Sequence, residues 1–186
     1  MAEQATLRLP TATSGSQEWQ TAQGRTATII NQIHAVKNLD ELFFGLKSEL
    51  ATLFDVEQLT IYAVDREKKE LYSKYLLDLL DGVQEIRVPI NEASISGYCA
   101  RYGKILNIAD AYDPAELAEI SPRLAFDPSW DKRSGFRCRQ MLAVPILVEQ
   151  KYLMGVLLLI NKRSGKRFTV EEEGFASDIA ETLGLA

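Results

Sequence analysis

The most restrictive feature of the sequence is a pair of apolar segments close to its C-terminal end. Val156–Ile160 is continuously apolar, which is typical of a central strand that is covered on both faces. The surrounding segment, Lys151–Asn161, follows Arg139–Val148 after a short polar turn, so we expect the two segments to pair as an antiparallel hairpin. A strand buried on both faces requires packed layers above and below its sheet.

Further strands are predicted upstream from β-rich runs and from the alternation of apolar residues. They lie at Leu59–Val64, Glu70–Leu76, Glu85–Ile90 and Ile105–Ile108. In the third segment Ile86, Val88 and Ile90 share one face, and Pro89 indicates the end of the strand or an edge of the sheet. Hairpin-joined strands with helices at both ends of the chain predict an α+β fold, an antiparallel sheet of about six strands covered by helices.

Two helices are predicted before the first strand. The first, Glu18–Lys37, carries an apolar stripe formed by Ile29, Ile30, Ile33 and Val36. Asn38 and Glu41 form a capping box for the second. Its apolar residues at helical spacing are Leu42, Phe43, Leu46, Leu50, Leu53 and Phe54. We expect residues 1–17, which lack periodicity, to form a flexible tail, and residues 18–186 to form a single domain.

Three more helices are predicted from their terminal residues. Ser94–Tyr102 is followed by Gly103 at a C-cap position, and Asp113 with Pro114 is a good helix start. Thr169 and Glu172 form a capping box for the last helix. The apolar residues of that helix are Phe175, Ile179 and Leu183.

The segment Asp110–Phe136 is predicted to be a long connection with little regular structure. Connections of this length in a compact domain are usually lids or binding loops. Basic residues gather around this segment at Lys132, Arg133, Arg137 and Arg139. They could meet an anionic ligand, but such a run is more often a solvated face, and we prefer that interpretation.

Composition argues against several classes of partner. The net charge of −5 disfavours nucleic acid, because a negative body repels phosphate backbones. Cys99 and Cys138 do not make a disulfide framework, which indicates a reducing compartment, and we expect both to be small buried side chains. No apolar run approaches the length of a membrane span and no secretory signal is seen. The expected location is the cytoplasm, without membrane insertion.

Residue patterns for common catalytic chemistry are absent from the sequence. It holds one histidine, His34, in the first predicted helix. No Cys/His cluster has metal-ligand spacing, and there is no P-loop and no GxGxxG motif. We therefore expect a non-catalytic domain without a metal or a resident cofactor.

Several motifs follow one another in a fixed order between residues 39 and 186. They are Ser94-Ile95-Ser96-Gly97-Tyr98, Ile105–Ile108 with Asp110-Ala111-Tyr112, Ser134–Arg137 leading to Met141–Ile146, and Asn161-Lys162 with Phe168 and Glu172-Glu173. Together they resemble the GAF domains of cyclic-nucleotide phosphodiesterases and adenylyl cyclases. Trp130-Asp131-Lys132 ahead of Ser134 also looks like GAF domains fused to type II secretion and type IV pilus assembly ATPases.

The resemblance implies a small-molecule site, for some members a cyclic-nucleotide site. The positions that match its ligand-binding residues are Thr60, Ile95, Ser96, Asp131, Ser134 and Cys138. The positions that match its structural signature are Asn161, Lys162, Phe168 and Glu172, with an ion pair expected between Lys162 and Glu172. Cys138 stands where a threonine is common, and Leu158 where some members carry a glutamate, so the chain departs from cGMP-type base recognition.

These observations leave three functions open. The first is a regulatory sensor, in which a small molecule binds under the Asp110–Phe136 segment and alters an effector. The second is a ligand-free dimerisation or docking module of a secretion or pilus ATPase, which would use the apolar stripe of Glu18–Lys37 and the last helix. The third is a GAF-type reductase, whose usual cysteine pattern Cys99 and Cys138 do not match. We expect a homodimer and an effector domain beyond residue 186.

Overall fold

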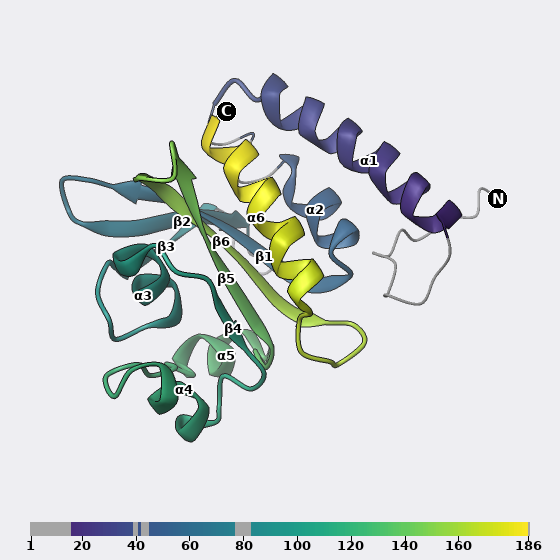
Figure 1. Ribbon diagram of the computed structural model, residues 1–186. Helices are drawn as coiled ribbons and strands as arrows, with labels where there is room; N and C mark the ends of the chain where they lie inside the picture. Colours follow the sequence, from purple (N-terminus) through teal and green to yellow (C-terminus); the bar gives the residue numbers. More distant parts are fainter. Residues whose placement is uncertain (1–15, 39–40, 42–44, 77–82, 186) are drawn as a thin grey trace.

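An antiparallel sheet forms the centre of the computed structural model, which describes residues 16–38, 41, 45–76 and 83–185. In these residues the sheet has six strands in the order β3–β2–β1–β6–β5–β4, and each neighbouring pair is antiparallel (Figure 1). The strands are β1 (Val56–Asp65), β2 (Glu70–Leu76), β3 (Val83–Pro89), β4 (Leu106–Ile108), β5 (Met141–Val148) and β6 (Tyr152–Lys162). The predicted α+β architecture is confirmed, and so is the position of Pro89 at the end of an edge strand.

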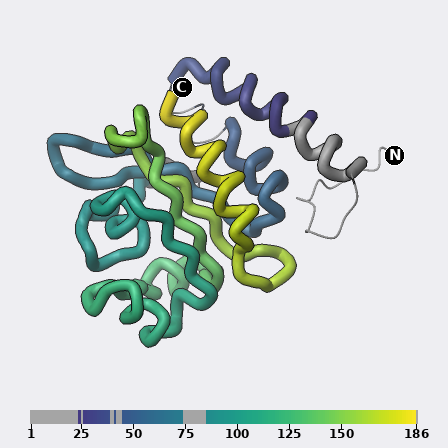
Figure 2. Tube along the Cα trace, viewed as in Figure 1, coloured from purple at the N-terminus to yellow at the C-terminus, as the bar shows by residue number. Residues whose placement is uncertain are grey.

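Helices cover both faces of the sheet. They are α1 (Ser16–Ala35), α2 (Lys47–Leu53), α3 (Ile95–Tyr102), α4 (Pro114–Ile120), α5 (Ser129–Ser134) and α6 (Val170–Leu185). On one face α6 packs on β5 and β6, α2 packs on β1, and α1 packs on α6 (Figure 2). Helices α3, α4 and α5 lie on the opposite side of the sheet (Figure 1).

The apolar run of β6 explains why both faces are covered. Leu157 and Leu159 are buried against the long helices, in one core with Phe54 and Ile179. Val156, Leu158 and Ile160, one residue out of phase, are buried in a second core on the side of α3. Because side chains alternate along a strand, a continuous apolar run supplies both cores at once.

The N-terminal helix buries the stripe that the sequence predicts. Ile29 and Ile33 belong to the core on the long-helix side, and Ile30 and Val36 pack against it. The helix begins at Ser16, so residues 16 and 17 of the predicted tail are helical and the predicted boundary was wrong by two residues. Residues 1–15 lie outside the described part of the chain. No described helix is long and apolar enough to cross a bilayer.

The hydrogen bonds of the predicted capping box at Asn38 form, but they do not begin α2, whose N-cap is Leu46 without a side-chain bond. Asn38 Oδ1 accepts a hydrogen bond from the backbone N–H of Glu41 at 2.9 Å, while Glu41 Oε2 accepts from the N–H of Lys37 at 2.8 Å. This is a capping box whose return bond is shifted by one residue. Helix α2 begins only at Lys47, and the predicted core residues Leu42 and Phe43 lie outside the described residues.

The predicted irregular segment Asp110–Phe136 contains two short helices. Helix α4 begins where the sequence predicts, with Asp113 accepting a hydrogen bond from the N–H of Ala115 at 2.9 Å. Helix α5 was not predicted. It begins after Asp127, whose carboxylate accepts bonds from the N–H and the hydroxyl of Ser129, both at 2.9 Å. The N-cap position itself is Pro128, without a side-chain cap, so the contacts of Asp127 form a local turn ahead of the helix.

Candidate functional site

Two adjoining cavities share a wall on the α3 side of the sheet. The first, which we call the lid cavity, has a volume of about 300 Å³ and is bounded by the start of α3, by β3 and by residues 125–133. The second, the strand slot, has a volume of about 360 Å³ and runs along β1. Residues that line both are Tyr62, Ile86, Trp130, Cys138, Leu158 and Ile160.

The residues carried over from the GAF resemblance divide between these cavities. Ile95, Ser96 and Asp131 line the lid cavity, whereas Thr60 and Ser134 line the strand slot. Cys138 lines both. The structure therefore brings the predicted residues to neighbouring cavities with a shared wall, rather than to one cavity.

The start of α3 is held close to the end of β3. Ser94 caps the helix, because its hydroxyl oxygen accepts a hydrogen bond from the N–H of Gly97 at 3.1 Å. A Cβ atom on Gly97 would lie 2.4 Å from the carbonyl oxygen of Pro89, so only glycine permits this approach. The first turn of α3 thus faces the lid cavity with N–H groups that attract anions.

Ser96 and Tyr62 are largely buried residues that line the lid cavity, and each is 6% exposed. Neither hydroxyl has a hydrogen-bond partner within the described residues. Burial raises the pKa of Tyr62 above its ordinary range, so its hydroxyl stays protonated at neutral pH. Among the described side chains the buried polar atom without a partner is Asn107 Oδ1, so the two hydroxyl oxygens can still be reached and a bound polar group could hydrogen-bond them.

Tyr62 was missed by reasoning from the sequence. It follows Thr60 by two residues on β1 and therefore points to the same face of the sheet. That spacing was the available signal, because Thr60 had been placed on the side of the site.

Asp131 is a buried carboxylate whose oxygens already have partners. Its Oδ2 accepts hydrogen bonds from the hydroxyl of Tyr112 at 2.7 Å and from the N–H of Cys138 at 2.8 Å. Its Oδ1 accepts from the thiol of Cys138 at 3.1 Å. Asp131 thereby ties α5 to the segment that enters β5. Its role in this structure is to hold the wall of the cavity.

The two cysteines are free thiols of low reactivity. Burial, assisted by the hydrogen bond to Asp131, raises the pKa of Cys138, and burial raises that of Cys99. The thiolate is the nucleophilic form, so both side chains are unsuited to attack. Within the described residues no group of His, Cys, Asp and Glu side chains could hold a metal ion.

The Asn-Lys signature connects β6 to its neighbours. Asn161 adopts a left-handed backbone conformation, with φ of 55°, which asparagine tolerates better than most residues. Its amide nitrogen donates to Glu57 Oε2 and to the carbonyl oxygen of Arg137, both at 2.8 Å. Its Oδ1 accepts from the N–H of Arg139 at 2.7 Å. Phe168 is buried in the core beneath α6.

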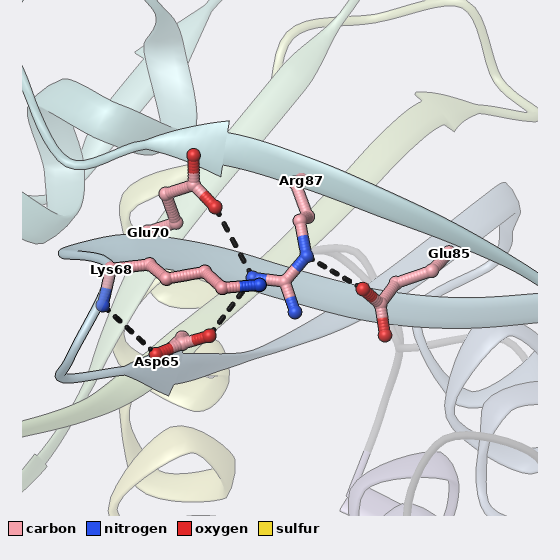
Figure 3. Close-up of polar contacts among 5 residues, drawn as sticks. All are labelled: Asp65, Lys68, Glu70, Glu85 and Arg87. Atoms are coloured by element: carbon pink, nitrogen blue, oxygen red, sulfur yellow. Dashed lines mark hydrogen bonds and ion pairs between the residues drawn. The ribbon is translucent and has the colours of Figure 1, made fainter.

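Arg87 at the rim of the lid cavity is surrounded by carboxylates. Its guanidinium group lies 2.9 Å from Asp65, 3.2 Å from Glu70 and 2.6 Å from Glu85 (Figure 3). These acidic side chains offset its charge. Arg133, which lies over the ring of Trp130, also lines the lid cavity and forms no ion pair within the described residues. Arg133 is thus the better placed of the two to meet an anion.

The chain belongs to the GAF domain family, whose model matches residues 38–186. It is 25% identical over 164 residues to the "Probable 3',5'-cyclic phosphodiesterase pde-5" of Caenorhabditis elegans, covering 82% of this chain and 21% of that protein. It is 27% identical over 169 residues to the dual 3',5'-cyclic-AMP and -GMP phosphodiesterase 11A of Takifugu rubripes, covering 85% and 18%. The chain thus spans about a fifth of the length of these relatives.

Solved structures share the fold at low sequence identity. The GAF domain of an Acinetobacter phosphoenolpyruvate-protein phosphotransferase superposes with a TM-score of 0.65 at 18% identity, covering 92% of each chain. A free methionine-R-sulfoxide reductase from Neisseria meningitidis in complex with its substrate gives a TM-score of 0.64 at 16% identity, covering 92% of this chain and 91% of that one. The fold therefore occurs both in domains of larger proteins and in enzymes.

Proposed function

We propose that this domain is a non-catalytic regulatory module that binds a small anionic molecule in the lid cavity. The observation that carries the proposal is that Ser96 and Tyr62, whose hydroxyl groups have no partner within the described residues, line one cavity at the start of α3. A cavity of about 300 Å³ is at the lower end of the range for small-molecule sites.

The lining of the cavity supports a cyclic nucleotide as the first ligand to test. The start of α3 and Arg133 favour a phosphate group, and the rings of Phe126 and Trp130 offer faces to a planar base. The similarity to proteins named as cyclic-nucleotide phosphodiesterases supports the same class. Cys138 and Leu158 in the shared wall supply no strong acceptor for guanine.

The regulatory role in this proposal depends on an effector in the same protein or in a partner. Ligand binding would order residues 110–136 and bias α6, whose first turn is tied to β6. The proposal includes a homodimer in the cytoplasm, to be tested by light scattering and by fractionation. The alternative, a ligand-free docking module, has less support because Ile29 and Ile33 of its expected interface are buried in the core of this chain.

A reductase function also has less support. The chemistry requires a reactive thiolate, and the raised pKa values of Cys99 and Cys138 disfavour that form. The hydrogen bond from Cys138 to Asp131 holds the thiol proton in place. The likeness to sulfoxide reductases therefore supports the fold alone.

A thermal-shift scan against cAMP, cGMP and cyclic dinucleotides tests the proposal, with calorimetry on each ligand that gives a shift. A ligand at about 100 times its Kd adds about 2.7 kcal/mol of stability, a rise in Tm of roughly 2–4 °C. We expect Ser96→Ala and Tyr62→Phe each to weaken binding about tenfold. Ser177→Ala on α6 and Tyr152→Phe on β6, both outside the cavity, should leave it unchanged. Absence of any shift, or equal affinity in all variants, would contradict the proposal.

A further inference from the structure

Strand β1 has an open edge within the sheet. It pairs with β6 along Val56–Ala63, but with β2 only at Ala63, Val64 and Asp65. Over residues 56–62 no described strand pairs with the edge of β1 that faces β2. Alternate residues of such an edge direct their N–H and C=O groups away from the paired neighbour, so these groups are available for other hydrogen bonds.

The strand slot follows this edge. Every residue from 57 to 62 lines it, although alternate side chains point to opposite faces of the sheet. A cavity that touches them all must run beside the backbone rather than above one face. Its opposite side is formed by Ser73 of β2 and Ile86 of β3. The slot therefore reaches through the sheet from the side of α5 to the side of α2.

Four hydroxyl or amide side chains of the slot have no partner within the described residues. Ser73 is 3% exposed, and its hydroxyl forms no hydrogen bond to a described residue. The same holds for the side chains of Ser48, Gln58 and Thr60, which also line the slot. Glu57, the carboxylate of the lining, is already bonded to Asn161 at 2.8 Å.

Lys47 supplies the positive charge of the slot. It lines the cavity from the first turn of α2, is half-buried, and forms no ion pair within the described part of the chain. Burial lowers the pKa of its ammonium group. A half-buried cation without a counter-ion is unfavourable, and a bound anion would remove that cost.

We propose that the strand slot is a second binding site, distinct from the lid cavity, for a small molecule that carries a phosphate or carboxylate group. The anion pairs with Lys47, and the open edge of β1 and the hydroxyl of Ser73 hydrogen-bond the polar remainder of the molecule. The two anion chemistries share these contacts, so the test uses a probe of each. The slot shares a wall with the lid cavity, but the contacts proposed here, to Lys47, Ser73 and the edge of β1, do not depend on the function proposed for the lid cavity.

The test is a titration of the ¹⁵N-labelled protein with inorganic phosphate and, separately, with succinate at constant ionic strength. We expect saturable shifts of the backbone amide signals of residues 57–62 and Ser73 with at least one probe, with a Kd on the order of 1–10 mM. Lys47→Met should weaken this binding at least tenfold, and Lys47→Arg should retain it. Lys104→Met, at an exposed lysine outside the slot, is the matched control.

The outcomes separate the two sites. Shifts confined to the first turn of α3 and abolished by Ser96→Ala would place the anion in the lid cavity, support the proposed function and overturn the slot. Slot shifts that persist unchanged in Lys47→Met, or no saturable slot shifts with either probe, would also overturn it. Slot shifts lost in Lys47→Met and kept in Ser96→Ala would support the slot even if no cyclic nucleotide binds. The Tm of unliganded Lys47→Met should equal or exceed that of the wild type, which confirms that the variant is folded.

Discussion

The ammonium group of Lys162 lies 2.7 Å from Oε1 and 2.8 Å from Oε2 of Glu172. The two side chains are 9% and 15% exposed. Glu172 Oε2 also accepts the N–H of Thr169 at 2.7 Å, and Thr169 Oγ1 accepts the N–H of Glu172 at 3.2 Å. The predicted ion pair is therefore confirmed, and it joins the end of β6 to the capping box that begins α6.

Removal of one partner of this pair should be costly. Lys162→Met leaves the Glu172 carboxylate largely buried beside Phe168 without its cation, and we expect a loss of about 2–4 kcal/mol in the free energy of unfolding. Urea denaturation measures the loss. The loss of unfolding free energy in the double variant with Glu172→Gln should be smaller than the sum of the losses in the two single variants, because the two residues interact directly.

The pair of Arg163 and Asp55 provides a control in which the cation is exposed while the carboxylate, at 15%, is as buried as Glu172. Their charged groups are 3.9 Å apart and Arg163 is 57% exposed, so Arg163→Ala should cost less than about 1 kcal/mol. Equal losses in Lys162→Met and Arg163→Ala would show that burial adds nothing to the Lys162–Glu172 pair.

Asp131→Asn should loosen the wall between the two cavities. An amide has one acceptor oxygen, so it cannot accept from Tyr112, the N–H of Cys138 and the thiol of Cys138 as the carboxylate does. We expect a loss of about 2–3 kcal/mol, seen as a lower urea midpoint and faster proteolysis after Lys132 or Arg133. Asp178→Asn on the exposed face of α6 is the control, and it should change neither the urea midpoint nor the rate of proteolysis.

The same contact predicts a decline of stability at alkaline pH. The hydrogen bond to Asp131 raises the pKa of Tyr112 above its ordinary value of 10.0. A raised folded-state pKa gives stability that is complete below the ordinary pKa and is lost as the pH rises towards the folded value. We expect Tyr112→Phe to flatten the fall in Tm above pH ~10. An unchanged alkaline slope in the variant would contradict this assignment.

The contacts of Arg87 with its neighbouring carboxylates predict a change of stability at acidic pH. The N–H of Lys68 and then the guanidinium group of Arg87 lower the pKa of Asp65 (Figure 3). A lowered folded-state pKa gives stability that is present above the ordinary pKa and is lost as the pH falls through the folded value. Arg87→Met should lower Tm at pH 7, and the difference from wild type should shrink below pH ~4. Arg123→Met, at a 76% exposed side chain, should show a smaller effect at pH 7.

Substitution of two glycines by alanine should change the free energy of unfolding in opposite directions. A Cβ atom on Gly155 would lie 1.9 Å from the carbonyl oxygen of Tyr62, so Gly155→Ala forces β1 and β6 apart and should cost about 3 kcal/mol. A Cβ atom on Gly174 in α6 meets nothing within 4 Å, and Gly174→Ala should add about 0.5–1 kcal/mol. Urea denaturation of both variants checks the pair. A similar change in both would show that the close approach at Gly155 is not limiting.

Local patterns were sufficient to predict most of the elements. The alternation of Ile86, Val88 and Ile90 placed an edge strand, and Thr169 with Glu172 placed the start of α6, because caps and side-chain periods act over a few residues. Helix α5 was missed because its N-cap, Pro128, makes no side-chain cap and its six residues lie in a segment without periodicity.

The arrangement of the site was less accessible, because it depends on contacts between distant parts of the chain. The bond from Tyr112 to Asp131 spans 19 residues and gives Asp131, a predicted ligand-binding residue, a structural contact that the sequence did not indicate. The open edge of β1 lies along residues 56–62, because β2 diverges from β1 beyond the pair of Tyr72 with Ala63. No local pattern encodes this divergence. Tyr62 and Lys47 acquire their importance only from that three-dimensional setting.

The divergence of β2 from β1 also divides the domain into parts of unequal resistance to opening. Strands β2 and β3 pair along their full length, from Glu70 opposite Pro89 to Leu76 opposite Val83. The strand pairing that joins this hairpin to β1 is limited to Ala63, Val64 and Asp65. Local unfolding follows such weak junctions. The hairpin can therefore separate as a unit while β1, β6 and β5 stay intact, and its amide protons should exchange with solvent earlier than theirs. Binding in either cavity, since Ile86 of this hairpin lines both, would slow that exchange and make it a direct readout of occupancy.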